Sequence, residues 1–276
     1  MSQKIFNNIF KGKTVLVTGH TGFIGSWLTL WLKYLGANII GYSLNPPTNP
    51  SLFDVLNLDN EIINVTSDIR DKKKLFETVK KYEPEFVFHL AAQSLVRDSY
   101  ENPLDTFDVN VLGTANMLEA LRFSSSVKVG LIMTSDKCYD NKINHRPHVE
   151  DDPMGGIDPY SASKGAAELI TSSYNDSFFN AIDDRAAIST IRAGNILGGG
   201  DWAKDRIVPD SINSIIKNQN IQIRNPDSIR PWQYVLEPIS GMLWLARKMY
   251  SNQKEFNQSW NFGPEIGQKF LTVKEI

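Results

Sequence analysis

A hydroxyl, a carboxylate and an ammonium group stand side by side where an apolar segment of the chain ends. Residues 127–132 read VKVGLI, the composition of a buried strand, and Ser135, Asp136 and Lys137 follow shortly after it. Charged groups at the end of such a strand are costly to bury unless water or a ligand meets them. A carboxylic acid can donate a proton and an amine can accept one, so the trio predicts an acid–base site. Taken alone, Asp136 and Lys137 would be interpreted as a surface ion pair at the start of a loop.

A tyrosine and a lysine four residues apart form a second candidate pair. In PYSASKGAAE, Tyr160 and Lys164 share one face of a predicted helix. A free phenol has a pKa of about 10 and is a poor base at neutral pH. A neighbouring ammonium group, or an oxidised nicotinamide, stabilises the phenolate and lowers that pKa. Tyr160 could then take a proton from a substrate hydroxyl, although the same spacing also occurs by chance on surface helices.

Three glycines lie between an apolar strand and a helical pattern. VTGHTGFIG places Gly19, Gly22 and Gly25 at this junction. Glycine permits a tight turn and the close approach of a pyrophosphate, which then binds free N–H groups at the positive end of the helix. The alternative is a tight turn that only packs the helix on the strand. The preceding strand and following helix favour a dinucleotide site.

The elements that position these residues alternate along the chain. Apolar strands are predicted at 13–19, 38–44, 61–69, 85–93, 127–134 and 186–198, and helices at 20–36, 71–84, 102–124 and 158–178. This alternation predicts an α/β fold with a doubly wound, Rossmann-type parallel sheet and a smaller C-terminal substrate-binding lobe. We expect residues 11–193 with 230–262 to form the NAD-binding domain, and 194–229 with 263–276 the lobe. The final FLTVKEI resembles the start of another helix, so we expect the chain to be C-terminally incomplete.

Composition excludes several classes of partner. The chain has 276 residues with a net charge of −2, so neither nucleic acid nor an anionic membrane is expected as a partner. The single Cys138 allows no internal disulfide, and no apolar stretch is long enough to span a bilayer; we expect a cytoplasmic protein. His145, His148 and the acidic residues at 150–152 could suggest a metal site, but we interpret them as a solvated polar loop and expect no metal.

The G-x-x-G-x-x-G spacing resembles the extended short-chain dehydrogenase/reductase superfamily, whose members act on nucleotide sugars. The resemblance implies that Ser135 completes a catalytic triad with Tyr160 and Lys164, and that Asp68 and Ile69 bracket an adenine. NAD is favoured over NADP because the second strand ends at Ser43 with no Arg or Lys nearby to hold a 2′-phosphate. The cofactor-binding residues so implied are Gly19, Thr21, Gly22, Phe23, Ile24, Gly25, Ser43, Asp68, Ile69, Leu90, Ala91, Ala92, Tyr160 and Lys164.

The Asp136–Lys137 pair narrows the resemblance further. Sugar-nucleotide dehydratases typically carry Asp-Glu there, whereas Asp-Lys is similar to the dehydratases that act on CDP-glucose. YSLNPPTNPSLF, RAGNILGGGDWAKDRIVPD and RPWQYVLEP resemble the same group. It implies an NAD-dependent lyase that oxidises the sugar at C4, eliminates water across C5 and C6, and returns hydride to C6. Asp136 would act as the acid and Lys137 as the C5 base.

A lysine base poses a difficulty, because a free ammonium has a pKa of about 10.4. Burial and nearby cations could depress that pKa, or Lys137 could only stabilise the enolate. For the CDP-hexose we expect Gln93 and Ser94 to face the sugar, Asn195 to contact the substrate, and Arg206 and Arg230 to hold the pyrophosphate. A nucleotide-sugar epimerase, a dehydratase for another nucleotide, or a non-catalytic NAD-binding protein remain alternatives. The resemblance also implies a homodimer through helices 102–124 and 158–178, and a route to deoxysugars of cell-surface polysaccharide such as O-antigen.

Overall fold

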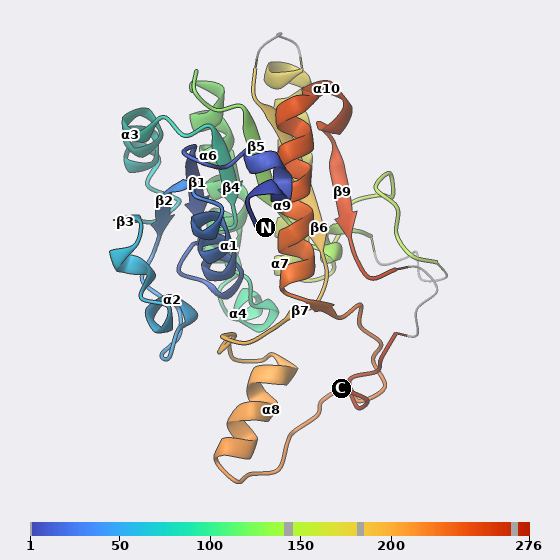
Figure 1. The fold of residues 1–276 in the computed structure, drawn as a ribbon. Coiled ribbons are helices and arrows are strands. Elements are labelled where there is room, and N and C mark those ends of the chain that lie inside the picture. The colour runs from blue at the N-terminus through green and yellow to red at the C-terminus, as the bar shows by residue number, and fades with distance from the viewer. Residues whose placement is uncertain (1, 141–145, 181–184, 266–269) are drawn as a thin grey trace.

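A parallel sheet forms the centre of the molecule (Figure 1). The computed structural model describes residues 2–140, 146–180, 185–265 and 270–276. Seven strands follow the order β3-β2-β1-β4-β5-β6-β9, and every neighbouring pair is parallel. This order confirms the predicted doubly wound fold. The strands are β1 Thr14–Thr18, β2 Asn38–Ser43, β3 Ile63–Thr66, β4 Phe86–His89, β5 Val129–Met133, β6 Ala187–Ala193 and β9 Ser259–Phe262.

Helices cover both faces of the sheet, which explains why its central strands are almost wholly apolar. On one face pack α1 (Phe23–Tyr34), α9 (Leu236–Ser251) and the N-terminal η1 (Ser2–Asn8). On the other face pack α3 (Lys72–Tyr82), α6 (Gly113–Arg122) and α7 (Pro159–Tyr174). The strand order reverses between β1 and β4, so a crevice is expected beyond their carboxyl ends, where ligands bind in open α/β sheets.

The helix predicted at 102–124 is interrupted by a π-helical turn. It consists of α5 (Pro103–Phe107), the π-helical η3 (Asp108–Leu112) and α6. Within this turn the buried Asn110 donates from Nδ2 to Ser163 Oγ at 2.9 Å and accepts from the Gln93 backbone N–H at 2.8 Å. Through Asn110, the π-helical turn is therefore hydrogen-bonded to both the loop after β4 and helix α7. A second π-helical turn, η5 (Asn175–Phe179), follows α7.

The chain after β6 leaves the central sheet. The predicted strand 186–198 is two strands, because β7 (Ile196–Leu197) pairs with β8 (Gln233–Tyr234) instead. Between them α8 (Ile207–Ile216) lies apart from the sheet layers (Figure 1). The helix start predicted from FLTVKEI is wrong, since Thr272 forms an antiparallel bridge with Ile229. The division into a domain and a lobe stays a prediction.

The remaining short helices lie in connections: α2 Leu52–Val55, η2 Leu58–Asn60, α4 Val96–Glu101, η4 Asp136–Cys138 and α10 Gln253–Phe256. No helix within the described ranges is long and apolar enough to cross a membrane.

Candidate active site

The predicted acid–base trio lies where β5 ends. Ser135 has extended backbone and caps the short helix η4, accepting a hydrogen bond at its Oγ from the Lys137 backbone N–H at 3.2 Å. The same hydroxyl donates to Asp136 Oδ1 at 3.1 Å. Ser135 is buried and Lys137 is exposed. Because one hydroxyl contacts both neighbours, the three residues share a defined local geometry.

Tyr160 and Lys164 lie on the first turns of α7, facing the end of β5. Pro159 occupies the first turn, and Asp158 caps the helix by accepting from the Ser161 backbone N–H at 2.9 Å. The Tyr160 backbone N–H donates to Ser99 Oγ at 3.1 Å, which ties this end of α7 to α4. Lys164 Nζ donates to the Met133 carbonyl at 3.3 Å, so the buried ammonium is held against the last residue of β5.

The two candidate groups meet around the ring of Tyr160. Lys137 Nζ lies 5.9 Å from the centre of this ring, and Lys164 Nζ lies 6.0 Å from it. The Ser135 side chain lies close enough to the Tyr160 hydroxyl to lower the pKa of the phenol. The structure therefore brings all five predicted catalytic residues together at the junction of β5 and α7.

Burial outweighs the neighbouring charges in setting the acidity of Tyr160. It raises the pKa of the phenol to about 12, although the Ser135 side chain opposes the change. Burial also lowers the pKa of Lys164 to about 8, against the opposing charge of Glu168. Nearby ammonium groups were expected to lower the pKa of the phenol. In the chain without a bound cofactor that expectation is wrong, because the pKa of Tyr160 is raised.

Asp136 has the electrostatics of a proton donor. Burial raises the pKa of its carboxyl, opposed by the Ser135 hydrogen bond and by the charges of Lys137 and Arg230. Gly194 lies close by, since a Cβ added to it would approach Asp136 Oδ2 to 3.0 Å. Lys137 is exposed, so the described residues do not bury its ammonium group.

The glycine turn between β1 and α1 is closely packed on the loop after β4. Gly19 has φ +71°, and a Cβ there would lie 2.8 Å from the backbone of Leu90 and Ala91. At Gly25 a Cβ would meet the Gly19 carbonyl at 2.1 Å, so this position also requires glycine. The N-cap of α1 is Gly22 and carries no side-chain cap. The backbone N–H groups of Phe23 and Ile24, at the start of the helix, are therefore not capped by a side chain.

Side chains near the end of β2 connect the turn to the sheet. Thr21 Oγ1 lies 2.9 Å from Ser43 Oγ and donates to the Leu44 carbonyl at 3.0 Å. Asp68 is bound by Arg70, whose Nη2 lies 2.6 Å from Oδ2, and the same guanidinium reaches Asp105 at 2.6 Å. The sequence analysis missed Arg70 near this end of the sheet. Its charge lowers the pKa of the Asp68 carboxyl.

The remaining predicted cofactor residues flank the same region. Leu90 and Ala91 donate their backbone N–H groups to Thr18 Oγ1 at 3.2 and 3.1 Å, which fixes the segment that continues into Ala92. Ile69 is buried, and its side chain would lie 2.7 Å from a Cβ added to Gly113. Their contacts with a cofactor stay a prediction.

Two of the predicted substrate residues contact each other across the chain. Arg206, which precedes α8, donates from Nη2 to Ser94 Oγ at 3.3 Å and from Nη1 to Asp201 Oδ2 at 2.9 Å. Gln93 is engaged within its own loop, because its Nε2 donates to Leu95 O at 3.0 Å and Thr106 Oγ1 at 2.9 Å, and its contact with a sugar stays a prediction. Gln93 therefore shapes the loop that presents Ser94.

Arg230 lies near Asp136, and Asn195 follows Gly194, which also lies beside this carboxylate. Arg230 is close enough for its charge to lower the pKa of Asp136, and its Nη1 donates to the Ile229 carbonyl at 3.2 Å. Asn195 separates β6 from β7, and its carbonyl accepts from the Gln233 backbone N–H at 2.9 Å. The direct contacts of both side chains with a substrate stay predictions.

A buried ion pair behind the site escaped the sequence analysis. Arg192 on β6 donates to Glu168 on α7 at 2.7 Å, and both side chains are at most 5% exposed. Glu168 also accepts from Thr134, the residue before Ser135. The only signal in the sequence was that Glu168 follows Lys164 by four residues, which places both on one face of α7.

The loop at 146–152 is solvated only in part, because Arg146, Val149 and Asp151 are exposed whereas Asp152 is buried. His148 stacks on Tyr139 with ring centres 4.4 Å apart, and its Nδ1 lies 3.0 Å from the buried Asp152. His145 lies outside the described residues. Within the described ranges, no group of three or more His, Cys, Asp or Glu side chains could hold a metal ion. Cys138 is buried, which raises the pKa of its thiol to about 12 and makes it a poor nucleophile.

The fold and this constellation define the class of the protein: a Rossmann-type enzyme of the extended short-chain dehydrogenase/reductase kind. The family model for GDP-mannose 4,6 dehydratase matches residues 16–261. The chain is 49% identical, over 94% of its length and 73% of the relative, to CDP-glucose 4,6-dehydratase of Salmonella typhimurium. The chain therefore belongs to the family of nucleotide-sugar 4,6-dehydratases.

Solved structures agree on the fold. The dTDP-glucose 4,6-dehydratase of Streptomyces venezuelae, with NAD bound, superposes with a TM-score of 0.80 at 21% identity, covering 95% of this chain and 78% of that one. The UDP-glucose 4-epimerase of Thermus thermophilus, in complex with NAD, gives a TM-score of 0.78 at 25% identity, over 95% and 80%. Epimerases and dehydratases thus share this architecture.

Proposed function

We propose that this chain dehydrates CDP-glucose to CDP-4-keto-6-deoxyglucose with NAD as its cofactor. The observation that carries the proposal is the placement of Asp136 and Lys137 beside Ser135 and the ring of Tyr160. An epimerase needs only the oxidation and reduction of one carbon, whereas elimination of water also needs an acid and a base next to the oxidised carbon. The 49% identity to the Salmonella enzyme supports the choice of CDP-glucose.

The turn between β1 and α1 fits a dinucleotide. Added Cβ atoms at Gly19 and Gly25 would collide with backbone, so the turn keeps its surface free of side chains, and the uncapped start of α1 offers N–H groups to a pyrophosphate. Ser43 and Thr21 offer hydroxyls for a ribose. NAD is favoured over NADP because Arg70 is engaged by two carboxylates and so is poorly suited to hold a 2′-phosphate.

When bound, NAD supplies a hydride acceptor for C4 of the sugar and, once reduced, a hydride donor for C6. Tyr160 takes the proton of the 4-hydroxyl while Ser135 holds the same oxygen. The phenol starts from a pKa of about 12, so the positive charge of the oxidised cofactor has to favour the phenolate. Lys164 stays near Tyr160 as a further positive charge.

The ketone at C4 makes the hydrogen at C5 acidic. Lys137 removes that hydrogen as a proton, and its exposed side chain is free to reach a bound sugar. Asp136, whose pKa is raised, gives its proton to the departing 6-hydroxyl and water is lost. As C6 is reduced, Lys137 returns the proton to C5, which gives the 4-keto-6-deoxy sugar. Arg206 and Ser94 are placed together to bind the charged and polar parts of the nucleotide sugar.

We also propose a homodimer built on α5, α6 and α7. These elements pack together and expose large apolar side chains, with Leu104 at 79%, Leu112 at 56% and Leu169 at 62%. Exposed large apolar side chains that gather on one face often mark an interaction site. Sedimentation should give a dimer, and a Leu104→Glu/Leu169→Glu variant should sediment as a monomer; Ile223→Glu, at an exposed site elsewhere, should not change the mass.

Incubation with NAD and CDP-glucose tests the activity. A 4-keto product absorbing in the ultraviolet in alkali is expected from CDP-glucose, and much less from dTDP-glucose, UDP-glucose or GDP-mannose. Tyr160→Phe should lose this product, whereas Glu237→Gln, which alters an exposed carboxylate on α9, should keep it. Failure of an NAD-loaded, folded chain to convert CDP-glucose would refute the substrate, and an epimerised sugar as product would favour the epimerase alternative.

A further inference from the structure

A second cavity lies far along α7 from the acid–base site. It has a volume of about 490 Å³, within the range of small-ligand pockets, and its walls come from the end of α7, η5, β6 and the segment that leads into β9. Tyr160 and Asn175 are fifteen residues apart on one helical run, which corresponds to roughly 22 Å at about 1.5 Å per residue. The cavity is therefore separate from the site proposed to bind the nucleotide sugar.

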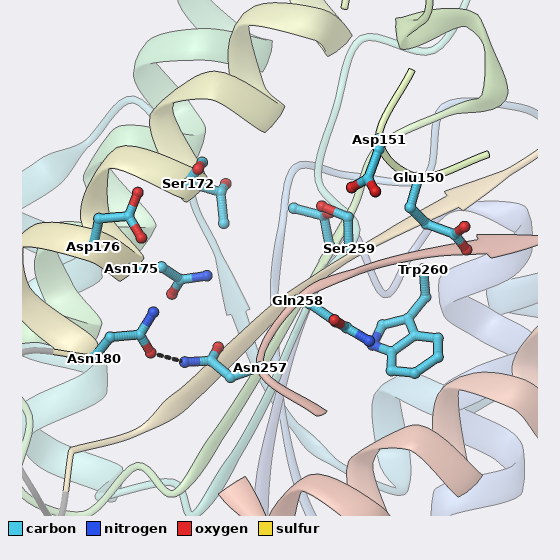
Figure 2. A pocket seen from close by; sticks show the side chains of 12 residues that line it. Glu150, Asp151, Ser172, Asn175, Asp176, Asn180, Asn257, Gln258, Ser259 and Trp260 are labelled. Atoms are coloured by element: carbon cyan, nitrogen blue, oxygen red, sulfur yellow. Dashed lines mark hydrogen bonds between the residues drawn. The ribbon is translucent and has the colours of Figure 1, made fainter. Parts of the chain in front are cut away.

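The walls of this cavity carry acceptors and negative charge. Its lining contains three carboxylates, four amides and four hydroxyls, and none of its twelve residues is Lys or Arg. Figure 2 shows the carboxylates on two sides, with Asp176 on the helical wall and Glu150 and Asp151 across from it. The lining residues are Glu150, Asp151, Thr171, Ser172, Asn175, Asp176, Asn180, Thr190, Asn257, Gln258, Ser259 and Trp260.

One buried acceptor on the helical wall has no partner. Asn175 is 8% exposed, and its Nδ2 donates to the Ile188 carbonyl at 3.0 Å, which fixes the orientation of the amide. Its Oδ1 receives no hydrogen bond. Figure 2 shows the side chain extending from the helix toward the strands, between Asp176 and Asn257. An unsatisfied buried acceptor is unfavourable, and a ligand that donates a hydrogen bond would relieve it.

We propose that this cavity binds a small aliphatic diammonium ion. Each ammonium group is a cation with three hydrogen-bond donors, which complements carboxylate and amide oxygens. Two such groups joined by a short chain could contact Asp176 at one wall and Asp151 at the other, as one charge could not. A divalent metal ion suits the site less well, because within the described ranges no three acidic, His or Cys side chains converge on one point.

Calorimetric titration of the whole chain with 1,4-diaminobutane tests the proposal. We expect saturable one-to-one binding that weakens as salt is added, because the carboxylates at the walls are exposed to solvent. Propylamine, which has one charge, and 1,4-butanediol, which has none, should bind more weakly. Equal binding of either compound, or of Mg²⁺, or an absence of saturable heat, would overturn the proposal. None of these measurements depends on turnover of CDP-glucose.

Substitutions at the two walls locate the binding. Since exposed ion pairs are individually weak, we expect Asp151→Asn and Asp176→Asn each to weaken binding about threefold and the double variant about tenfold. Both changes keep the size of the side chain and lie on the surface, so the fold should be retained. Glu237→Gln removes an exposed charge on α9, outside the lining, and should leave the affinity unchanged. An unchanged affinity in the Asp151→Asn/Asp176→Asn variant would show that diamines bind elsewhere.

Discussion

Lys137 and Tyr160 belong to different elements, yet Lys137 Nζ lies 5.9 Å from the centre of the Tyr160 ring. Lys137 is placed by the turn after β5, and Tyr160 by the first turn of α7. Their approach depends on the packing of α7 against η4 and on the contact of Lys164 with the end of β5. Tyr160 is proposed to take the 4-hydroxyl proton during the oxidation, and Lys137 is proposed to remove the C5 proton afterwards. Their closeness lets both act on neighbouring carbons of one bound sugar.

Replacing Lys137 by Ala should block the elimination step. If its amine removes the C5 proton, kcat for CDP-glucose should fall by about 10² to 10⁴, the usual contribution of a positioned base. Incorporation of deuterium at C5 in D₂O should be lost to a similar extent. Lys137→Arg separates the two proposed roles, because Arg keeps the positive charge but cannot lose its proton. Activity close to the original in Lys137→Arg would show that the lysine only stabilises the enolate.

The carboxyl of Asp136 should make kcat depend on pH, and this dependence should be absent in Asp136→Asn. The carboxyl must be protonated to act as an acid, and burial raises its pKa, so kcat should decline as the pH rises through that pKa. Asp136→Asn should be slower by about 10² or more, because the amide has no proton to give. A kcat profile that keeps the same descending limb in Asp136→Asn would assign that limb to another group.

Arg206 should contribute mainly to substrate binding. Its guanidinium reaches Ser94 and is oriented by Asp201, so it is placed for an anionic ligand, and its charge also acts on Tyr160. Because hydrogen bonds to charged groups are strong, Arg206→Ala should raise KM by about tenfold to a hundredfold with a smaller effect on kcat. Arg247→Ala, whose side chain lies against Trp244 on α9, is the matched control and should leave KM unchanged. A fall in kcat alone would contradict this assignment.

The sequence predicted the sheet and its catalytic edge because both depend on local patterns. Apolar strands and a glycine turn are visible within a few residues, and parallel strands bring their carboxyl ends to one edge, which placed Ser135 near Tyr160. The contact of Arg206 with Ser94 spans 112 residues and has no local signal. The packing of Asp152 and the interruption at Asn110 likewise depend on tertiary contacts. Burial at Tyr160, which reversed the expected pKa shift, also depends on the folded surroundings.

The buried pair of Glu168 and Arg192 should matter for stability. Removing one member leaves the other charge unpaired in the interior, so Glu168→Gln should lower the free energy of unfolding by about 3 to 5 kcal/mol. Glu119→Gln is the control, since it breaks a pair with Arg122 at the surface of α6 and should cost about 1 kcal/mol or less. Urea unfolding followed by circular dichroism compares the two. Similar losses in both variants would contradict the role assigned to burial.

Two buried histidines should make the fold sensitive to mild acid. His89 lies between Thr18 and Thr114, and burial lowers its pKa to about 3; burial likewise lowers the pKa of His20 to about 4. Both imidazoles are neutral when folded and gain protons on unfolding, so they stabilise the fold above pH 6.5, and that stability is lost as the pH falls toward the folded pKa values. Between pH 6.5 and about pH 4.5 the unfolding free energy should decrease by about 4 kcal/mol, before most carboxylates titrate. A His20→Gln/His89→Gln variant should lose most of this slope in urea titrations, and an unchanged slope would place the sensitivity in other groups.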